Sequence, residues 1–458
     1  MQLSSTILTA LALAITSIEA IPVPAGQPLS SNVQKQSIKP YSQESLDNFN
    51  VLKYLDTVAP YIQGSGYGIS KEVPYKCKVT QANLLSRHGE RYPSSKKIEK
   101  INKHFQDLKN STNIEGPAEF LEGYDFEGLE EKEAGEETAK GPYSGLLDLY
   151  AHGSIFREAY DDLYNEEVGI KFYSASGSRI VASAESFAQG FLGESYNKSS
   201  IQIIDEEDKS LGANTLTPVD TCENYDEDSN EKKLDEFDDK FLKKIAKRIN
   251  SENKGLDLSK KAVKSLMYYC GVELMGEGST EICDLFTPND WVEYAYMRDV
   301  KYYYEKGPGN KLSETSGKPY VEAIIKALKD ENLNLTLSFT HSSDIFPVLS
   351  ALGIFNGDEE LPIDHQVFNH PWKISNIMPM GARLILERLE CEDEQDSFVR
   401  IIHNDAVIPI ENYSKGPGFS TSLKDFEKYI NERLDGKDFR KDCGNDDNTP
   451  QDLTIFWE

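Results

Sequence analysis

Residues 78–93 read KVTQANLLSRHGERYP. From Val79 to Leu85 the side chains alternate as in a strand and are mostly apolar or small, which predicts a largely buried β-strand. Gly89 then supplies a turn. Apolar residues follow at helical spacing; they are Ile98, Ile101, Phe105 and Leu108. The stretch predicts a strand, a tight turn that carries charged residues, and a helix.

Two later stretches repeat this order. Ile170 to Tyr173 and Leu333 to Phe339 are predicted strands, and each is followed by a turn and a helical pattern. Two more predicted strands, Arg383 to Leu389 and Ser397 to His403, lie near the end of the chain. Strands that alternate with helices predict an α/β fold with a mostly parallel central sheet flanked by helices. Ligands of such sheets bind beyond the carboxyl ends of the strands.

The length of 458 residues suits one large domain or two closely packed ones. Residues 206–300 begin with an Asp-, Glu- and Lys-rich stretch of helical pattern and predict a smaller, mostly helical subdomain. It would interrupt an α/β domain formed by residues 46–205 and 301–458. Residues 21–45 are rich in Pro, Ser and Gln and predict a loose N-terminal arm.

Residues 1–20 are typical of an export signal. Ile7 to Ile15 is largely apolar but too short to span a bilayer, and Ala20 is a small residue suited to cleavage. No Lys or Arg precedes the apolar run, and the alternative is a buried N-terminal helix. No later segment is long and apolar enough to be transmembrane. The sequence therefore predicts a secreted protein, whether extracellular, periplasmic or in the cell wall.

Cysteines and glycosylation sequons agree with export. The cysteine count is even and no CxxC occurs, so disulfides are favoured over a metal site, although the sequence does not fix their pairing. The cysteines are Cys77, Cys222, Cys270, Cys283, Cys391 and Cys443. Four sequons predict glycosylation at Asn110, Asn197, Asn334 and Asn412.

The net charge of −28 excludes a nucleic-acid-binding protein, because no basic stripe offsets it. The histidines outside the motifs discussed below lack metal-ligand spacing, and no Gly-rich phosphate loop occurs. We therefore expect no metal and no cofactor. A polyanionic ligand would need a local cationic pocket against this overall charge.

The turn after the first strand carries the strongest chemical signal. Arg87 and Arg91 flank His88 at the end of a buried strand. Guanidinium groups match phosphate oxygens in bidentate geometry. A histidine held between them faces the phosphorus and can attack it. Gly89 lets the backbone approach the ligand closely.

The heptad from Arg87 to Pro93 resembles the RHGxRxP signature of the histidine acid phosphatases, the high-molecular-weight branch of the histidine phosphatase superfamily. Residues 175–184 and 339–345 resemble two further family segments, and the likeness runs from about residue 54 to residue 457. It implies that Arg87, Arg91, Arg179 and His341 bind phosphate and that His88 is the nucleophile. It also implies the histidine phosphatase fold, a helical domain beside the pocket, and disulfides that pair Cys77 with Cys391, Cys222 with Cys443, and Cys270 with Cys283.

One position departs from the family. Yeast members carry an aspartate directly after the second histidine as proton donor, whereas this chain has Ser342. A positioned acid contributes roughly 10²–10⁴ in rate when the leaving group is a basic alkoxide. Three readings stay open: Asp344 donates, directly or through a water held by Ser342; the enzyme cleaves only aryl phosphates well; or the sequence is that of an inactivated variant. Asp344 is also a good helix N-cap.

The resemblance implies a secreted acid phosphatase of small-molecule phosphate esters that acts through a phosphohistidine and prefers phytate (myo-inositol hexakisphosphate). One alternative is a broad acid phosphatase with an impaired proton donor, and another is a decayed phosphate-ester-binding protein. Phosphoglycerate mutases that depend on a cofactor also carry RHGE. They are shorter and cytosolic, so the export signal, the cysteines, Arg91 and Pro93 argue against them.

Overall fold

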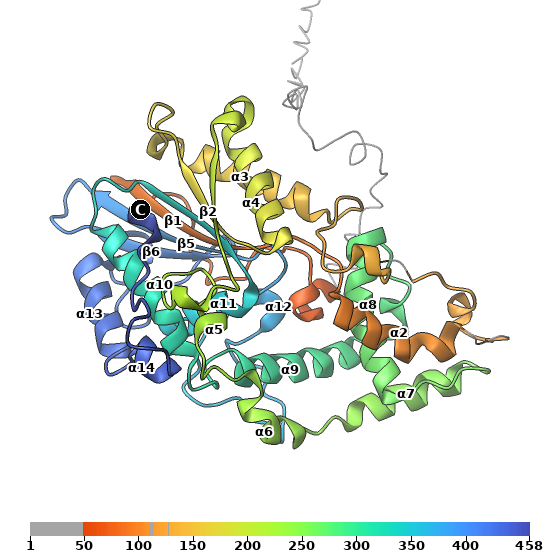
Figure 1. Ribbon diagram of the computed structural model, residues 1–458. Helices are drawn as coiled ribbons and strands as arrows, with labels where there is room; N and C mark the ends of the chain where they lie inside the picture. The colour runs from red at the N-terminus through yellow and green to blue at the C-terminus, as the bar shows by residue number, and fades with distance from the viewer. Residues whose placement is uncertain (1–48, 110, 112, 127) are drawn as a thin grey trace, which may run out of the picture.

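The computed structural model describes residues 49–458 except 110, 112 and 127. The predicted signal peptide and the whole of the predicted arm lie outside the described residues. The described chain forms one eight-stranded sheet with helices on both faces and a helical region beside it (Figure 1). This is the α/β fold that the strand–helix alternation predicted.

The strands of the sheet are parallel on one side of β1 and antiparallel on the other. Its strands are β1 (Cys77–Arg87), β2 (Lys171–Ala175), β3 (Ser200–Ile204), β4 (Leu335–Thr340), β5 (Arg383–Cys391), β6 (Phe398–His403), β7 (Ala406–Val407) and β8 (Thr421–Ser422). The order is β3-β2-β4-β1-β5-β6-β7, with β8 paired to β6. The pairs within β3-β2-β4-β1 are parallel. All pairs from β1–β5 onward are antiparallel. The expected parallel order thus holds for the strands that lead to the motifs.

Helices cover both faces of the sheet (Figure 1). One face carries α3 (Gly145–Ala159) and α4 (Ser178–Leu192), and the other carries α10 (Ser313–Leu328), α11 (Ser342–Leu352) and α13 (Leu423–Arg433). Aromatic rings pack α4 against the sheet: the ring centroids of Phe187 on α4 and Phe339 on β4 lie 5.2 Å apart. The remaining short helices are α5 (Pro218–Thr221), α6 (Glu231–Asp235), α12 (Ile374–Ile377) and α14 (Phe439–Cys443).

The helical region has an apolar core of its own. It contains α7 (Lys240–Glu252), α8 (Lys260–Glu277) and α2 (Ser95–Lys109). α2 and the segment before β1, which also contributes to this core, were predicted from the sequence to belong to the α/β part. Helix α9 (Pro288–Glu305) joins the two cores, because Trp291 packs in the helical one and Val300 in that of the sheet.

The three disulfides have the pairing that the resemblance implied. Cys77–Cys391 joins the start of β1 to the end of β5, Cys222–Cys443 joins residues 221 positions apart, and Cys270–Cys283 closes a short loop of the helical region. Asn197, Asn334 and Asn412 are exposed, and Asn110 lies outside the described residues. Among the described helices, none is long and apolar enough to cross a membrane.

Candidate active site

The two motif histidines meet at the carboxyl ends of neighbouring parallel strands. Arg87 and Thr340 are register partners at the ends of β1 and β4. The His88 backbone N–H donates to the Thr340 carbonyl at 3.3 Å, and the His88 and His341 ring centroids lie 6.1 Å apart. Segments 253 residues apart in sequence therefore form one site, at the edge of the sheet where the strand order predicted ligand binding.

His88 is held as a neutral imidazole with one unprotonated nitrogen. Its Nδ1 lies 2.8 Å from the Gly89 carbonyl, so Nδ1 carries the proton and donates it there. Nε2 then carries the lone pair and accepts a long hydrogen bond from Nε of Arg91, at 3.5 Å. Burial, and next the charges of Arg87 and Arg91, hold the His88 pKa well below its usual value. The ring stays unprotonated in mild acid, which a nucleophile requires.

The Gly89 peptide that orients His88 is itself fixed. Its N–H donates to Oε1 of Glu137 at 2.8 Å and to Oγ of Ser183 at 3.1 Å, and the Ser183 hydroxyl donates to the same Glu137 oxygen. Burial raises the Glu137 pKa to about 8, which keeps this carboxyl protonated in acid. A Cβ atom on Gly89 would lie 2.7 Å from the carbonyl oxygen of Gly145 at the start of α3, so only glycine fits here.

The arginines keep donors free for a ligand. Arg87 uses Nη1 to bind the carbonyls of Thr57 and Met378, at 2.9 and 2.8 Å. The buried Nε atoms of Arg87 and Arg179 have no hydrogen-bond partner within the described part of the chain. Burial lowers the pKa of Arg87 to about 9 and that of Arg179 to about 10, so both remain cationic in acid. Unpaired buried donors on converging cations favour an anionic ligand.

His341 lies between a cation and a carboxylate. Its Nδ1 is 3.0 Å from Nη2 of Arg179, and its Nε2 is 3.1 Å from Oε2 of Glu206. Glu206 also accepts the Gly177 N–H at 3.0 Å. The hydrogen bond to His341 lowers the Glu206 pKa and keeps that carboxylate charged. Sequence reasoning missed Glu206 and Glu137, because each is an ordinary acidic residue far in sequence from the histidine or peptide it contacts.

Asp344 lies in the first turn of α11 and is buried. Its Oδ1 accepts the Val219 N–H at 3.3 Å and its Oδ2 accepts the Ser343 hydroxyl at 3.0 Å. Burial raises the Asp344 pKa well above its usual value. Ser342, at the family's donor position, is partly exposed. Its hydroxyl has too high a pKa to act as an acid.

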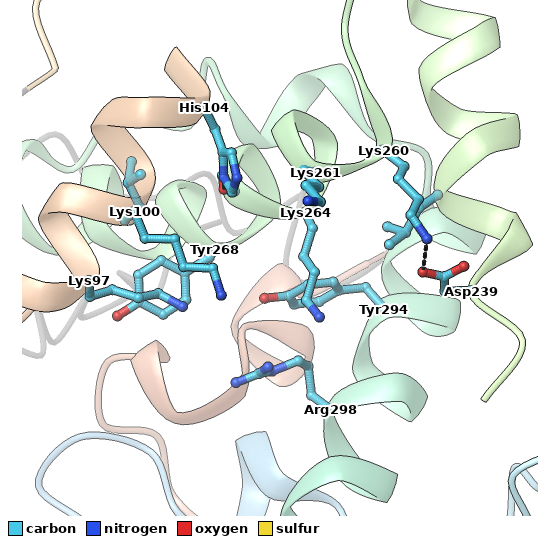
Figure 2. Close-up of a pocket in the computed structure, with 13 residues that line it drawn as sticks. Lys97, Lys100, His104, Asp239, Lys260, Lys261, Lys264, Tyr268, Tyr294 and Arg298 are labelled. Carbon is cyan, nitrogen blue, oxygen red and sulfur yellow. Dashed lines mark hydrogen bonds and ion pairs between the residues drawn. The ribbon is translucent and has the colours of Figure 1, made fainter. Parts of the chain in front are cut away.

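A cationic cavity of about 330 Å³ lies in the helical region. Figure 2 shows Lys97 and Lys100 from α2, Lys264 from α8 and Arg298 from α9 directed into one space. Burial, and next the charge of nearby Arg298, lower the pKa of Lys97 to about 7 and that of Lys264 to about 8. Both side chains are therefore charged in acid.

The cavity adjoins the RHGERYP turn. Nζ of Lys97 lies 4.0 Å from the ring centroid of Tyr268, which lines the cavity. Burial raises the Tyr268 pKa to about 12, and the charge of Arg91 opposes this shift, so that arginine is close by. Arg298, which also lines the cavity, forms an ion pair with Asp56. The next residue, Thr57, accepts a hydrogen bond from Arg87 through its carbonyl. The arginines predicted to bind phosphate thus lie close to the lysine cavity.

Comparison with known proteins identifies the family of this sequence. The histidine phosphatase superfamily (branch 2) matches residues 78–404. The chain belongs to this family. It is 36% identical to the phytase PHO112 of Candida albicans over 94% of this chain and 95% of that one. It is 35% identical to the constitutive acid phosphatase of Saccharomyces cerevisiae, over 89% and 90% of the two chains.

The crystal structure of the phytase from D. castellii superposes with a TM-score of 0.86 at 34% identity, covering 93% of this chain and 94% of that chain. The resemblance and the fold class predicted from the sequence are thereby confirmed. As a histidine phosphatase with these relatives, the chain is a phosphoric monoester hydrolase. The roles of His88, Arg87, Arg91, Arg179, His341 and Asp344 stay predictions, now with the geometry described above.

Proposed function

We propose that this histidine phosphatase hydrolyses phosphomonoesters through a phosphohistidine on His88, with phytate as a preferred substrate. The observation that carries the proposal is the neutral His88 ring, whose unprotonated Nε2 lies among guanidinium groups that keep donors free. Arg87, Arg91, Arg179 and His341 bind the phosphoryl oxygens and stabilise their growing negative charge.

The chemistry proceeds in two steps. Nε2 of His88 forms a bond to phosphorus while the ester P–O bond breaks, and the departing oxygen takes a proton from a carboxylic acid. Water then attacks the phosphohistidine, the P–N bond breaks, and His88 is restored with release of inorganic phosphate. The sequence suggests Asp344 as this acid. Its raised pKa keeps it protonated, but it is buried with both oxygens hydrogen-bonded.

The cationic cavity supports phytate as the substrate. Phytate carries several phosphates around one ring, so while one is attacked the others need cationic contacts. Lys97, Lys100, Lys264 and Arg298 lie next to the phosphate-binding arginines and supply such contacts. A single-phosphate aryl ester would not reach this cavity. The cavity therefore favours a phytase over a broad acid phosphatase.

The test compares initial phosphate release from phytate and from nitrophenyl phosphate at pH about 4–5. We expect His88→Ala to lose both activities and the acid-labile phosphoenzyme. We expect Lys97→Ala with Lys264→Ala to raise KM for phytate at least about tenfold and to leave nitrophenyl phosphate nearly unchanged. Lys254 is exposed and pairs with Glu115, and Lys254→Ala is the matched control.

Three results would contradict the proposal or part of it. Near wild-type turnover in His88→Ala would exclude the nucleophile. Phytate binding without phosphate release by the wild-type chain would favour the decayed binding protein. Equal loss of both substrates in the lysine variant would remove the argument for phytate and leave a broad acid phosphatase.

We also propose that the chain is exported, because the apolar N-terminal run, the disulfides and the exposed sequons agree. The first residue of the mature protein and its mobility shift on deglycosylation test this. An N-terminus at Met1 with no shift would contradict it.

A further inference from the structure

The missing acid beside His341 must be replaced if an alkyl ester is to be cleaved quickly. The neighbouring carboxyl groups differ in availability. Glu206 is charged and bonded to His341. Glu137 lies buried behind the Gly89 peptide. Asp344 is buried and holds two hydrogen bonds. None of these three presents a free carboxyl group to a bound ester.

The short helix α5 lies across the end of β4, beside His341. The Thr340 hydroxyl, one residue before His341, donates to the Leu216 carbonyl at 2.7 Å. The Val219 N–H donates to Asp344 at 3.3 Å. Residues 216–219 are therefore attached to the strand end and to the first turn of α11, on either side of His341 and Ser342. Asp220 follows directly on this segment.

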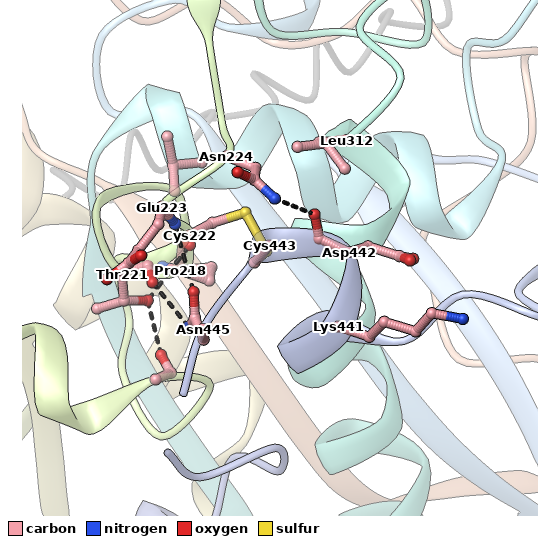
Figure 3. Close-up of a disulfide and its surroundings, with 12 residues drawn as sticks. Pro218, Thr221, Cys222, Glu223, Asn224, Leu312, Lys441, Asp442, Cys443 and Asn445 are labelled. Carbon is pink, nitrogen blue, oxygen red and sulfur yellow. Dashed lines mark hydrogen bonds between the residues drawn. A yellow bond between two sulfur atoms is a disulfide. The ribbon is translucent and has the colours of Figure 1, made fainter. Parts of the chain in front are cut away.

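The other end of α5 is equally fixed. Figure 3 shows the Cys222–Cys443 disulfide with the surrounding hydrogen bonds. Asn445 donates from Nδ2 to the Thr221 carbonyl at 2.9 Å, and the Thr221 hydroxyl donates to the Gly212 carbonyl at 2.6 Å. A helix of four residues held on both sides has little freedom, so it presents Asp220 in one place.

Asp220 is exposed, and within the described residues its carboxylate has neither a hydrogen bond nor an ion pair. The charges that act on it are those of His341, Glu206, Lys306 and Glu227. In turn, burial lowers the pKa of His341, and the Asp220 charge is among those that oppose this shift, so the two groups are near each other. Partial desolvation raises the Asp220 pKa, and Glu206 adds to this. A raised pKa increases the protonated fraction in mild acid.

We propose that Asp220 is the general acid that protonates the leaving oxygen and takes the place of the aspartate that Ser342 lacks. This inference rests on the proposed phosphohistidine mechanism. As the P–O bond breaks, the Asp220 hydroxyl gives its proton to the departing alkoxide and becomes a carboxylate. That carboxylate then accepts a proton from the water that attacks the phosphohistidine, which restores the acid. Asp344 holds α5 through the Val219 N–H and is a positioning residue.

The test uses leaving groups of different basicity. Loss of a general acid slows departure of a basic alkoxide but hardly affects nitrophenolate. We expect Asp220→Asn to lower kcat for glycerol phosphate and phytate by roughly 10²–10⁴ and to change kcat for nitrophenyl phosphate only a few-fold. Glu223 carries an exposed carboxyl group on the same loop, so Glu223→Gln is the matched control. It should change kcat for neither the alkyl nor the aryl ester. Adding Ser342→Asp to Asp220→Asn should restore alkyl-ester cleavage.

Three outcomes would overturn the assignment. An alkyl-selective loss in Asp344→Asn but not in Asp220→Asn would transfer the role to Asp344. An equal loss of aryl and alkyl cleavage in Asp220→Asn would show a structural role. Unchanged alkyl cleavage in Asp220→Asn would exclude the residue. Failure of the underlying mechanism looks different, because the wild-type enzyme would then form no phosphoenzyme from nitrophenyl phosphate.

Discussion

His88 needs a neutral ring and a fixed tautomer, and different neighbours supply the two. Burial and the surrounding guanidinium groups lower its pKa, so it keeps a lone pair in acid where an ordinary histidine is protonated. The Gly89 carbonyl fixes the proton on Nδ1. Because the same arginines are proposed to bind phosphate, the charges that would attract the substrate also keep the proposed nucleophile unprotonated.

Glu137 should matter for catalysis although it touches no substrate. It holds the Gly89 peptide whose carbonyl orients His88. We expect Glu137→Leu to lower kcat roughly tenfold to a hundredfold with little change in KM, because the imidazole loses its fixed orientation. Glu137→Gln should keep most activity, since an amide oxygen accepts the same N–H bond. Steady-state kinetics on nitrophenyl phosphate measure this, with the exposed Glu131→Gln as control. Equal losses in the Leu and Gln variants would refute the role.

At the scale of elements, periodicity predicted the strands and helices that carry motifs. β1, β2 and β4 and the helices that follow them have clear apolar patterns, and the structure confirms them. β3 was not predicted, because Gln202 and Ile203 are exposed and its pattern is weak. Nor was α5, a helix of only four residues whose place is set by distant partners such as Thr340 and Cys443. The Glu206–His341 and Glu137–Gly89 contacts depend on folding in the same way.

The Cys222–Cys443 disulfide should act on the reaction through α5. Replacing both cysteines by serine should cost about 2–5 kcal/mol of unfolding free energy and loosen the turn that carries Asp220. We therefore expect alkyl esters to lose more kcat than nitrophenyl phosphate. Cys77→Ser with Cys391→Ser is the matched control, because that bridge lies at the opposite end of β1 from His88. A similar substrate bias in both double variants would contradict a specific effect through α5.

On the scale of the whole molecule, charge is distributed unevenly. The chain carries a net charge of −28, yet the site and its cavity gather arginines and lysines. The field of the whole chain opposes approach of a polyanion, while the local cations attract it. In mild acid many carboxylates lose their charge and the lysines keep theirs, so the balance shifts toward binding. Acidic working conditions therefore suit substrate capture as well as the proton donor.

The fold itself should be more stable in acid, and Glu90 offers a direct test. It is buried, its Oε1 accepts the Tyr61 N–H at 2.8 Å, and burial together with the nearby Asp148 raises its pKa from 4.5 to about 8. Between these values the native state holds a proton that the unfolded state has released, so stability falls as pH rises from about 4.5 to 8. Glu90→Gln cannot titrate and keeps an oxygen for the Tyr61 N–H. We expect the unfolding free energy of the wild type to fall relative to this variant by on the order of a few kcal/mol between pH about 5 and 8.

Denaturant titrations measure this difference in unfolding free energy, and Glu207→Gln, at an exposed position, is expected to follow the wild type. Parallel curves for wild type and Glu90→Gln would mean that Glu90 is ionised throughout, and the acid stability would then need another source.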